Sequence, residues 1–201
     1  MGFLKGSASF VRFDVEGQLP EDALDFIAER IKGYAFRDID DTYDEYSIGW
    51  VSVANMFDAS FAYASYAVGD NIVLTLRVDE RKVSAAALKK MVQKEEERVR
   101  QEKQLPKLSR GMKVEIRERV KSELTKKALP VPATYDLYWN LSENTVFFFT
   151  TNKKMHAVLE DFFKEVFGLM LRQRIPYSIG LSLLNPDEAS RLERITPQLF
   201  I

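Results

Sequence analysis

The chain of 201 residues has no cysteine and a single histidine. Without cysteine it cannot use a thiolate nucleophile, a zinc ribbon or an iron–sulfur cluster. The longest apolar run, residues 145–150, is far shorter than the roughly 20 residues of a transmembrane helix, and the first residues lack the apolar segment of a signal peptide. No glycine-rich phosphate loop of the GxxxxGK(S/T) or GxGxxG kind occurs. We therefore expect a cytoplasmic protein without a cofactor and without a membrane segment.

The chain as a whole also lacks an excess of charge of one sign, although one of its regions has such an excess. Lys and Arg number 29 and Asp and Glu 30, a formal net charge of −1, and an evenly charged surface of this kind argues against a nucleic-acid partner. Residues 77–127, however, hold 17 basic and 9 acidic residues, a local net charge of +8. The other 150 residues carry a net charge of −9. The near-neutral total therefore combines a basic region with an acidic remainder.

The first 78 residues predict a small β/α module. Alternating apolar residues and β-formers predict strands over residues 8–15, 47–55, 60–68 and 71–77. A helix is expected between Leu19 and Gly33, because Pro20 and acidic residues stand in its first turn. After this helix comes a loop, residues 34–46, that is rich in Asp, Glu and Tyr.

Residues 79–130 predict a long helical hairpin. Apolar residues recur with a helical period over 84–104, and Pro106 interrupts the pattern. Ser109 is the expected N-cap of a second helix, in which apolar residues recur at every fourth position. Two prolines near residue 130 end that helix, because proline cannot continue it.

After the hairpin the first pattern returns, and residues 131–184 predict a second β/α module. Strands are expected over residues 134–141, 145–150 and 177–184. A helix capped by Asn152 is expected to run to Gly168. Residues 185–201 form a tail with a short capped helix and an apolar end at 199–201. The predicted fold class is α+β, in which two small β/α modules with antiparallel sheets flank a long basic helical hairpin.

The hairpin offers the main candidate site. Seven cations recur at helical spacing on its two helices, and two more stand near its tip. These candidate nucleic-acid-binding residues are Lys90, Lys94, Arg98, Lys103, Lys107, Arg110, Lys113, Arg117 and Lys121. Each cation that neutralises a phosphate releases a condensed counterion, which gives affinity without base contacts. The alternative is a solvated hairpin laced with ion pairs, because glutamates are interleaved with these cations.

Four other features favour structural roles. The loop at 38–45 lacks the glycine and the distant glutamate of a calcium loop, so it is a solvated acidic loop or a docking surface for a basic partner, such as the hairpin of a second copy. His156 has no second histidine with which to share a metal. Trp50 and Trp139 are expected core anchors, with base stacking as the alternative. The phenylalanines at 147–149 predict a strand that is buried on both faces.

A series of short motifs occurs in a set order along the chain. They are Ala35-Phe36-Arg37, Gly49-Trp50-Val51, the strand into Arg77, the two charged helices, Leu129-Pro130, Trp139, and Thr151-Asn152-Lys153-Lys154. This order and spacing resemble the RdgC family of recombination-associated proteins. The resemblance covers roughly residues 8–184. One departure lies at Val131-Pro132-Ala133, where the family pattern has Arg-Ala-Phe, so no role of that aromatic residue transfers.

The resemblance implies non-enzymatic binding of duplex DNA with little sequence preference, by ring-shaped dimers that restrain recombinase filaments. We therefore expect sequence-independent binding of double-stranded DNA by a nucleoid-associated homodimer, in the control of recombination or replication and with a recombinase as a candidate partner. The alternative is a protein-interaction or assembly module that has kept the fold and lost DNA binding. An enzyme is a more distant alternative, because a metal-dependent nuclease needs clustered carboxylates, which only the loop at 38–45 offers.

Overall fold

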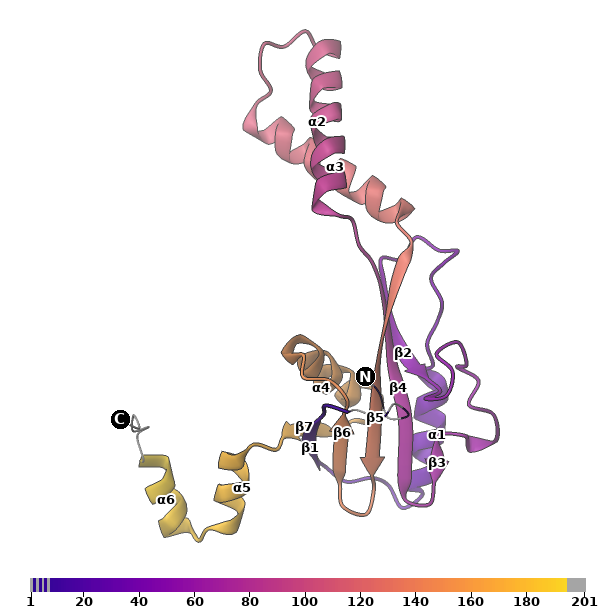
Figure 1. Ribbon diagram of the computed structural model, residues 1–201, viewed down its shortest axis with the longest axis vertical. Coiled ribbons are helices and arrows are strands. Elements are labelled where there is room, and N and C mark those ends of the chain that lie inside the picture. The colour runs from indigo at the N-terminus through magenta and orange to yellow at the C-terminus, as the bar shows by residue number, and fades with distance from the viewer. Residues whose placement is uncertain (1, 3, 5, 7, 195–201) are drawn as a thin grey trace. The chain divides into compact units, whose positions relative to one another are not determined.

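The computed structural model describes residues 2, 4, 6 and 8–194 and confirms a mixed α+β fold (Figure 1). Its elements in chain order are β1 (Val11–Glu16), α1 (Ala23–Gly33), β2 (Tyr46–Val51), η1 (Ala62–Ala64), β3 (Ala67–Val68), β4 (Asn71–Arg81), α2 (Ala85–Glu102), α3 (Arg110–Lys127), β5 (Pro130–Asn140), β6 (Thr145–Phe148), α4 (Lys153–Phe167), β7 (Met170–Gln173), α5 (Pro176–Leu183) and α6 (Pro186–Arg194). The hydrogen-bonded strand order is β2-β4-β5-β6-β1-β7, with β3 beside β4. The apolar end at 199–201 lies outside the described residues.

The chain divides into two compact units, and each is assembled from separated segments. The first unit comprises Met1–Gly33, Ala62–Leu74 and Tyr135–Ile201, and the second comprises Tyr34–Phe61 and Thr75–Thr134. Strands β4 and β5 each contribute residues to both units. The helical hairpin and the acidic loop are therefore parts of the same unit.

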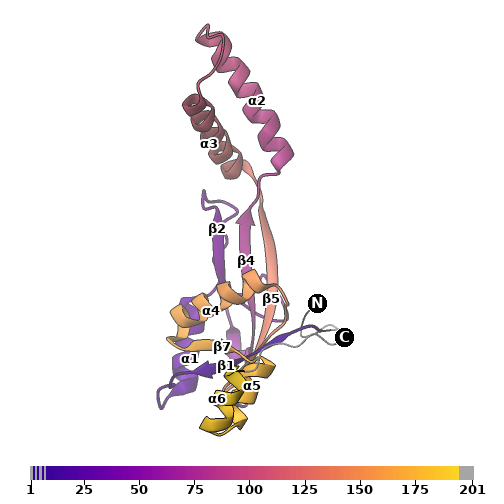
Figure 2. The same ribbon diagram turned by 90° about the vertical axis from the view of Figure 1, so that its left-hand side faces the viewer.

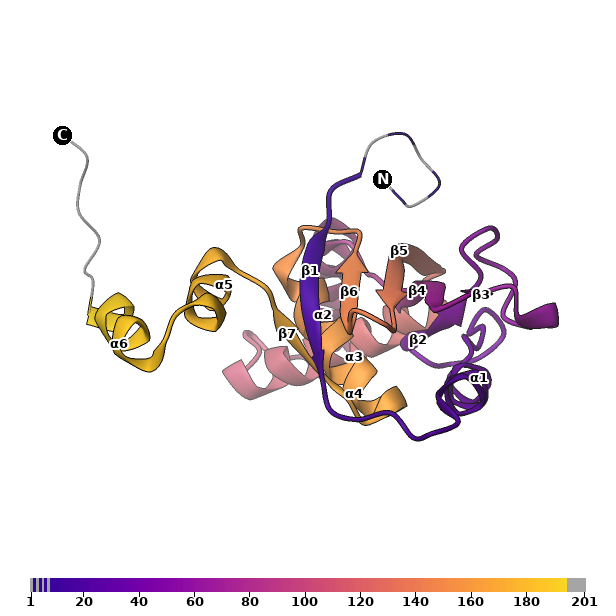
Figure 3. The ribbon, with the colours of Figure 1, turned by 90° about the horizontal axis from the view of Figure 1, so that it is seen from below.

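In the first unit, β1 lies between β6 and β7 and pairs antiparallel with both (Figure 3). Because side chains alternate along a strand, one face of these strands is apolar. Phe13, Trp139 and Phe148 point to that face and are fully buried. Helix α4 covers it, since His156 lies edge-on to Phe13 at 5.8 Å between ring centroids, and Phe163 lies 5.0 Å from Trp139.

Helix α4 begins and ends where its sequence predicts. Asn152 Oδ1 accepts the amide of Lys154 at 3.0 Å, and Gly168 ends the helix with a left-handed φ of 71°. The end of α4 is tied to α1, because the guanidinium of Arg30 donates to the carbonyl of Glu165 at 2.9 Å and also to that of Val166. Cations suit this position, since the last carbonyls of a helix lack partners within the helix.

In the second unit, β2 pairs antiparallel with β4 and places Trp50 opposite Leu76. Trp50 is fully buried, as is Trp139 in the first unit, and this confirms that both are core anchors. The segment before β2 runs alongside it, since the amide of Phe36 donates to the carbonyl of Trp50 at 2.9 Å. A Cβ at Gly49 would overlap the backbone of Phe36, so this close approach requires glycine.

Helices α2 and α3 form the predicted hairpin and lie side by side (Figure 2). Ser109 caps α3 as expected, because its Oγ accepts the amide of Met112 at 3.3 Å. Ser84 caps α2 in the same way and accepts the amide of Ala87 at 3.2 Å. Each helix therefore begins where a serine satisfies one of its free amides.

Two predicted strands are wrong. Residues 177–183 fall in helix α5, because Pro176 stands at its first position and the Ser178 hydroxyl accepts the amide of Ile175 at 3.0 Å. The last strand is instead β7, directly after the turn at Gly168, and it pairs with β1. Residues 60–68 hold only η1 and the two-residue strand β3, since positive φ angles at residues 61 and 64 interrupt an extended chain.

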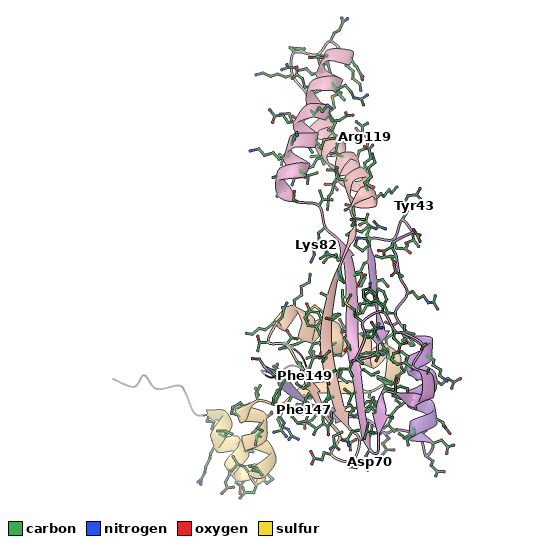
Figure 4. All side chains as sticks on the ribbon, turned by 45° about the vertical axis from the view of Figure 1, so that its right-hand side comes forward. Tyr43, Asp70, Lys82, Arg119, Phe147 and Phe149 are labelled. Atoms are coloured by element: carbon green, nitrogen blue, oxygen red, sulfur yellow. The ribbon has the colours of Figure 1, made fainter. Side chains whose placement is uncertain are left out.

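The prediction that the phenylalanines at 147–149 are buried on both faces is also wrong. Phe148 is fully buried on the face that α4 covers. Phe147 and Phe149 lie on the opposite face and are only half-buried (Figure 4). Alternation along the strand thus places one ring in the core and two outside it.

Candidate nucleic-acid interface

The hairpin has a small apolar core of its own. Val99 of α2 and Ile116 and Val120 of α3 form this seam and are buried together. Partly buried residues pack around them, namely Leu88, Val92, Leu108, Met112 and Leu124. Because the seam fixes the rotation of each helix, it also fixes which cations face solvent.

Glutamates neutralise part of the positive charge of the hairpin. Arg98 donates to both carboxylate oxygens of Glu95, at 2.6 and 2.9 Å, and Arg119 of the other helix donates to the same carboxylate. The hydrogen bond from Arg98, followed by the charges of both arginines, lowers the pKa of Glu95 below its ordinary value. Arg98 also lies 3.4 Å from Glu102. This candidate cation is therefore engaged within the protein.

Most of the other candidate cations have no such partner. Lys113 Nζ lies 3.9 Å from Glu96, at the limit of an ion pair. Seven candidates have no carboxylate oxygen of the described residues within 4.0 Å of their charged nitrogens. They are Lys90, Lys94, Lys103, Lys107, Arg110, Arg117 and Lys121. These side chains can meet an external anion without first breaking an ion pair.

Helix α3 carries its candidate cations on one flank. Lys113, Arg117 and Lys121 each follow an apolar residue of the seam or its border by one position, which turns them about 100° from it. Arg110 lies seven residues before Arg117 and continues the same row. We name these four residues the α3 row. It extends over about 17 Å of helix axis at 1.5 Å per residue.

Two candidate cations of α2 do not share a hollow with Arg117 of the α3 row. Lys94 and Arg98 line a hollow of about 430 Å³ with Lys127 of α3. Arg117 of the α3 row lines a different hollow, of about 640 Å³, with Lys89 of α2. The structure therefore places Lys94 and Arg98 in one hollow of the hairpin surface and Arg117 in another, while Lys107 and Lys113 line a third.

Sequence reasoning did not single out Lys89 and Lys127 as contributors to these hollows. Lys89 follows Leu88 at the seam by one position, just as Arg117 follows Ile116. A cation one position after an apolar residue of the stripe can be recognised in the sequence, so Lys89 could have been predicted as a neighbour of Arg117. Lys127 stands in the last turn of α3, where basic residues are also expected for the helix dipole, so its position alone does not indicate a site.

A buried arginine holds the acidic loop at the end of the hairpin. Arg81 of β4 donates to four carbonyls of the loop, which are those of Ile39, Asp40, Thr42 and Asp44 at 2.7, 3.3, 2.9 and 2.9 Å. It also donates to the carbonyl of Ala128, the C-cap residue of α3. One guanidinium thus joins the loop to the end of α3. No motif indicates this contact, because every acceptor is a backbone atom.

The acidic loop consequently has a defined position relative to the α3 row. Four of its carbonyls face Arg81 and its acidic side chains face solvent, with Tyr43 80% exposed at its tip (Figure 4). Arg110 lies 18 residues before Ala128, or about 27 Å along the helix, while the Debye length is about 8 Å at physiological salt. The negative field of the loop is therefore screened at the outer end of the row and strongest near Lys121.

The remaining candidate, the single histidine, lies in the protein core. His156 is buried, and its Nε2 lies 2.9 Å from the carbonyl oxygen of Thr150. Across the residues that the structure describes, no group of three His, Asp or Glu side chains is placed to hold a metal ion. In that same part of the chain, no helix combines the length and apolarity needed to cross a bilayer.

A family model described as "Putative exonuclease, RdgC" matches residues 9–176. The chain belongs to the RdgC family. The match includes the whole hairpin and ends at the first residue of α5. No curated protein matches the chain.

Three of the short motifs that resemble RdgC proteins, at residues 35–37, at 49–51 and at the strand into Arg77, contribute to the framework of the second unit. Trp50 exchanges backbone hydrogen bonds with the segment at 34–36, at 2.9 and 3.0 Å. Arg77 donates to both carboxylate oxygens of Asp79, at 2.7 and 2.8 Å, and its guanidinium lies 4.1 Å from the ring centroid of Phe36. These residues are buried. These three motifs therefore maintain the fold, and the ligand has to be inferred from the surface.

Proposed function

We propose that this RdgC-family protein binds double-stranded DNA without sequence preference and without catalysis, and that the α3 row makes the contact. The observation that carries the proposal is the α3 row itself, four cations on one flank of a single regular helix. Arg110, Arg117 and Lys121 of this row have no carboxylate of the described residues within 4.0 Å. Of the candidates on α2, only Lys90 and Lys94 share that state, whereas Arg98 is held by two glutamates. Unpaired cations lose no internal partner when they meet a phosphate, so they contribute more to DNA affinity.

Binding of this kind is electrostatic. Each cation that neutralises a phosphate of B-DNA contributes about −0.9 to the slope of log affinity against log salt concentration. Four cations predict a slope of about −3.6 for each bound chain. Phosphate contacts position a protein on the duplex but do not read its sequence. A row of cations on one flank of a regular helix therefore supports affinity for any duplex.

A homodimer is part of the proposal, motivated by the family resemblance. Two copies that engage one duplex double the number of phosphate contacts, and the salt slope then approaches about −7. A dimer bound along a duplex obstructs other proteins that act on the same DNA. This suits a nucleoid-associated role in the control of recombination or replication, with a recombinase as the affected partner.

Fluorescence anisotropy with two unrelated duplexes of about 20 base pairs tests the proposal. R117E/K121E reverses two charges one turn apart in the α3 row, and K90E/K94E makes the same change on α2. We expect R117E/K121E to abolish binding to both duplexes at moderate salt and K90E/K94E to weaken it less. Circular dichroism checks that both variants fold. Equal weakening by the two pairs would contradict the α3 row as the site.

A protein-interaction module is the alternative, and the acidic loop favours it. Arg81 fixes the loop with its acidic side chains and Tyr43 in solvent, an arrangement that suits a basic partner. If wild-type protein shifts neither duplex at low salt, this alternative replaces DNA binding.

The exonuclease activity named in the family description is a further candidate. A metal-dependent nuclease uses clustered carboxylates to hold its ions. Incubation of end-labelled duplex with Mg²⁺ or Mn²⁺ tests it directly. Progressive shortening of the labelled strand by wild-type protein, but not by buffer, would contradict a non-enzymatic function.

A further inference from the structure

One face of the sheet in the first unit carries a row of aromatic and cationic side chains. The strand register pairs Tyr138 of β5 with Phe147 of β6, and Phe147 with Arg12 of β1. Arg174 comes next, since its amide donates to the carbonyl of Arg12 at 2.8 Å. Directly paired residues point to the same face of a sheet. Aromatic rings therefore occupy one half of the row and arginines the other half.

The aromatic half centres on Phe10, directly before β1. Its ring centroid lies 5.3 Å from that of Phe147, at an interplanar angle of 67°, and 5.7 Å from that of Phe149. Phe147 also meets Tyr138 edge-on at 5.6 Å. Phe10 nevertheless remains 45% exposed. Its neighbours thus hold the ring in place and leave part of its surface to solvent.

The cationic half borders a hollow of about 700 Å³. Arg12, Arg172 and Arg174 line it, together with side chains of α5. Arg172 and Arg174 are paired with carboxylates of β1. Arg12 is different, because no carboxylate oxygen in the described part of the chain lies within 4.0 Å of it, and its guanidinium lies 5.2 Å from the ring centroid of Phe147. The hollow therefore keeps one uncommitted cation beside the aromatic cluster.

We propose that this face binds single-stranded DNA, with bases stacked on Phe10 and Phe147 and a backbone phosphate at Arg12, the arginine of the hollow without an ion pair to the described residues. Every base has a π-face, so an exposed and rigidly held ring is a sequence-tolerant platform. An arginine beside the rings adds a phosphate contact and cation–π interactions. We name this surface the stacking face. Its residues are Phe10, Arg12, Phe147, Arg172 and Arg174.

The stacking face distinguishes unpaired strands from duplexes. In a duplex, neighbouring bases cover the faces of each base, so a ring on the surface of a sheet reaches them only where the strand is unpaired. The α3 row, in contrast, meets phosphates, which both forms of DNA present. The stacking face belongs to the first unit and the α3 row to the second, so the two sites can be tested separately.

A tryptophan at position 10 reports base stacking directly. Trp50 and Trp139 are both fully buried, so F10W adds an indole whose emission responds to ligands at the surface. An oligothymidine of about 10 nucleotides, within the range of single-strand sites, should quench this emission when titrated into the full chain. An abasic strand of the same length and charge should quench it much less, because it has no bases to stack.

Removal of the ring tests the contribution to affinity. F10A changes no charge and should weaken oligothymidine binding roughly tenfold, while F10W should restore it. Duplex affinity of F10A should stay near that of the wild type, and circular dichroism checks that the variant folds. Quenching in the F10W background should persist when R117E/K121E is added, whether or not that pair affects duplex binding.

The outcomes separate this inference from the proposed duplex binding. Equal quenching by the oligothymidine and the abasic strand overturns the stacking face, because charge alone then explains the signal. Unchanged oligothymidine affinity in a folded F10A variant overturns it as well. Selective quenching with intact duplex binding supports it, and so does selective quenching by a chain that fails to bind duplex DNA.

Discussion

Replacement of Arg81 by methionine removes the guanidinium that joins the acidic loop to the end of α3. Arg81 is 7% exposed and donates to five backbone carbonyls. Methionine is a flexible apolar side chain that can fill the space of the arginine side chain, but it donates no hydrogen bond. The five acceptors would lose their partner where water has little access.

The expected loss of stability follows from the burial of these bonds. The bond to Ile39 is fully buried and the other four are partly buried. A buried acceptor without a partner costs about 1–3 kcal/mol, and an acceptor that regains water costs less. With about 2 kcal/mol for Ile39 and about 0.5 kcal/mol for each of the others, R81M should lower the free energy of unfolding by about 4 kcal/mol. This lies at the upper end of single-residue effects.

Urea unfolding followed by tryptophan fluorescence measures this difference, and K82M is the matched control. Lys82 is the next residue, its side chain is 62% exposed, and its only ion pair among the described residues is with Glu80 at 3.2 Å (Figure 4). K82M should therefore change stability by less than about 0.5 kcal/mol. Amide hydrogen exchange over residues 39–44 should rise in R81M alone. A loss below about 1 kcal/mol in R81M, or equal losses in both variants, would refute the reasoning.

Other substitutions probe the same unit. Gly49→Ala should abolish stable folding of the second unit, because its Cβ would overlap backbone, whereas Gly33→Ala meets no atom within 4 Å and should be tolerated in thermal melts. Ser109→Ala should cost about 1 kcal/mol in urea unfolding through loss of the N-cap. Glu95 has a lowered pKa in the folded state, so its stabilisation is present above its unfolded value of about 4.3 and is lost as pH falls through the folded value. In thermal unfolding measured over a range of pH values, the unfolding midpoint of E95Q should therefore fall less steeply at acidic pH than that of the wild type.

Local sequence signals were sufficient to predict the helices of the hairpin and helix α4. The caps at Ser109 and Asn152 and the left-handed turn at Gly168 each depend on atoms within about one turn of the chain. Such signals can be seen in a single sequence because no distant residue has to be placed first. The mixed α+β class followed from the alternation of these helices with short β-rich segments.

Segments whose pattern fits two structures were less predictable. Apolar residues dominate 177–184, and a short apolar run is compatible with a strand or a buried helix. Pro176 and Ser178 decide in favour of α5, because together they start a helix. The four-residue strand β7 was missed because its pairing with β1 spans more than 150 residues of sequence.

The candidate site was predictable in composition but not in arrangement. Charge counting located the basic hairpin, yet the state of each cation depends on the partner that the other helix brings to it. Glu95 accepts from Arg98 one turn away and from Arg119, which is 24 residues away. The contacts of Arg81 are equally distant in sequence and end on backbone atoms. Such contacts follow from the tertiary structure and leave no residue-type signature.

The salt dependence of duplex binding tests the central claim most directly. Four phosphate contacts give a log–log slope of about −3.6 per bound chain, or a loss of affinity of about 150-fold between about 50 and about 200 mM salt. R117A/K121A removes two contacts and should reduce the slope to about −1.8, while K90A/K94A should leave it near −3.6. A slope that R117A/K121A does not change, or that both pairs reduce equally, would contradict DNA binding through the α3 row.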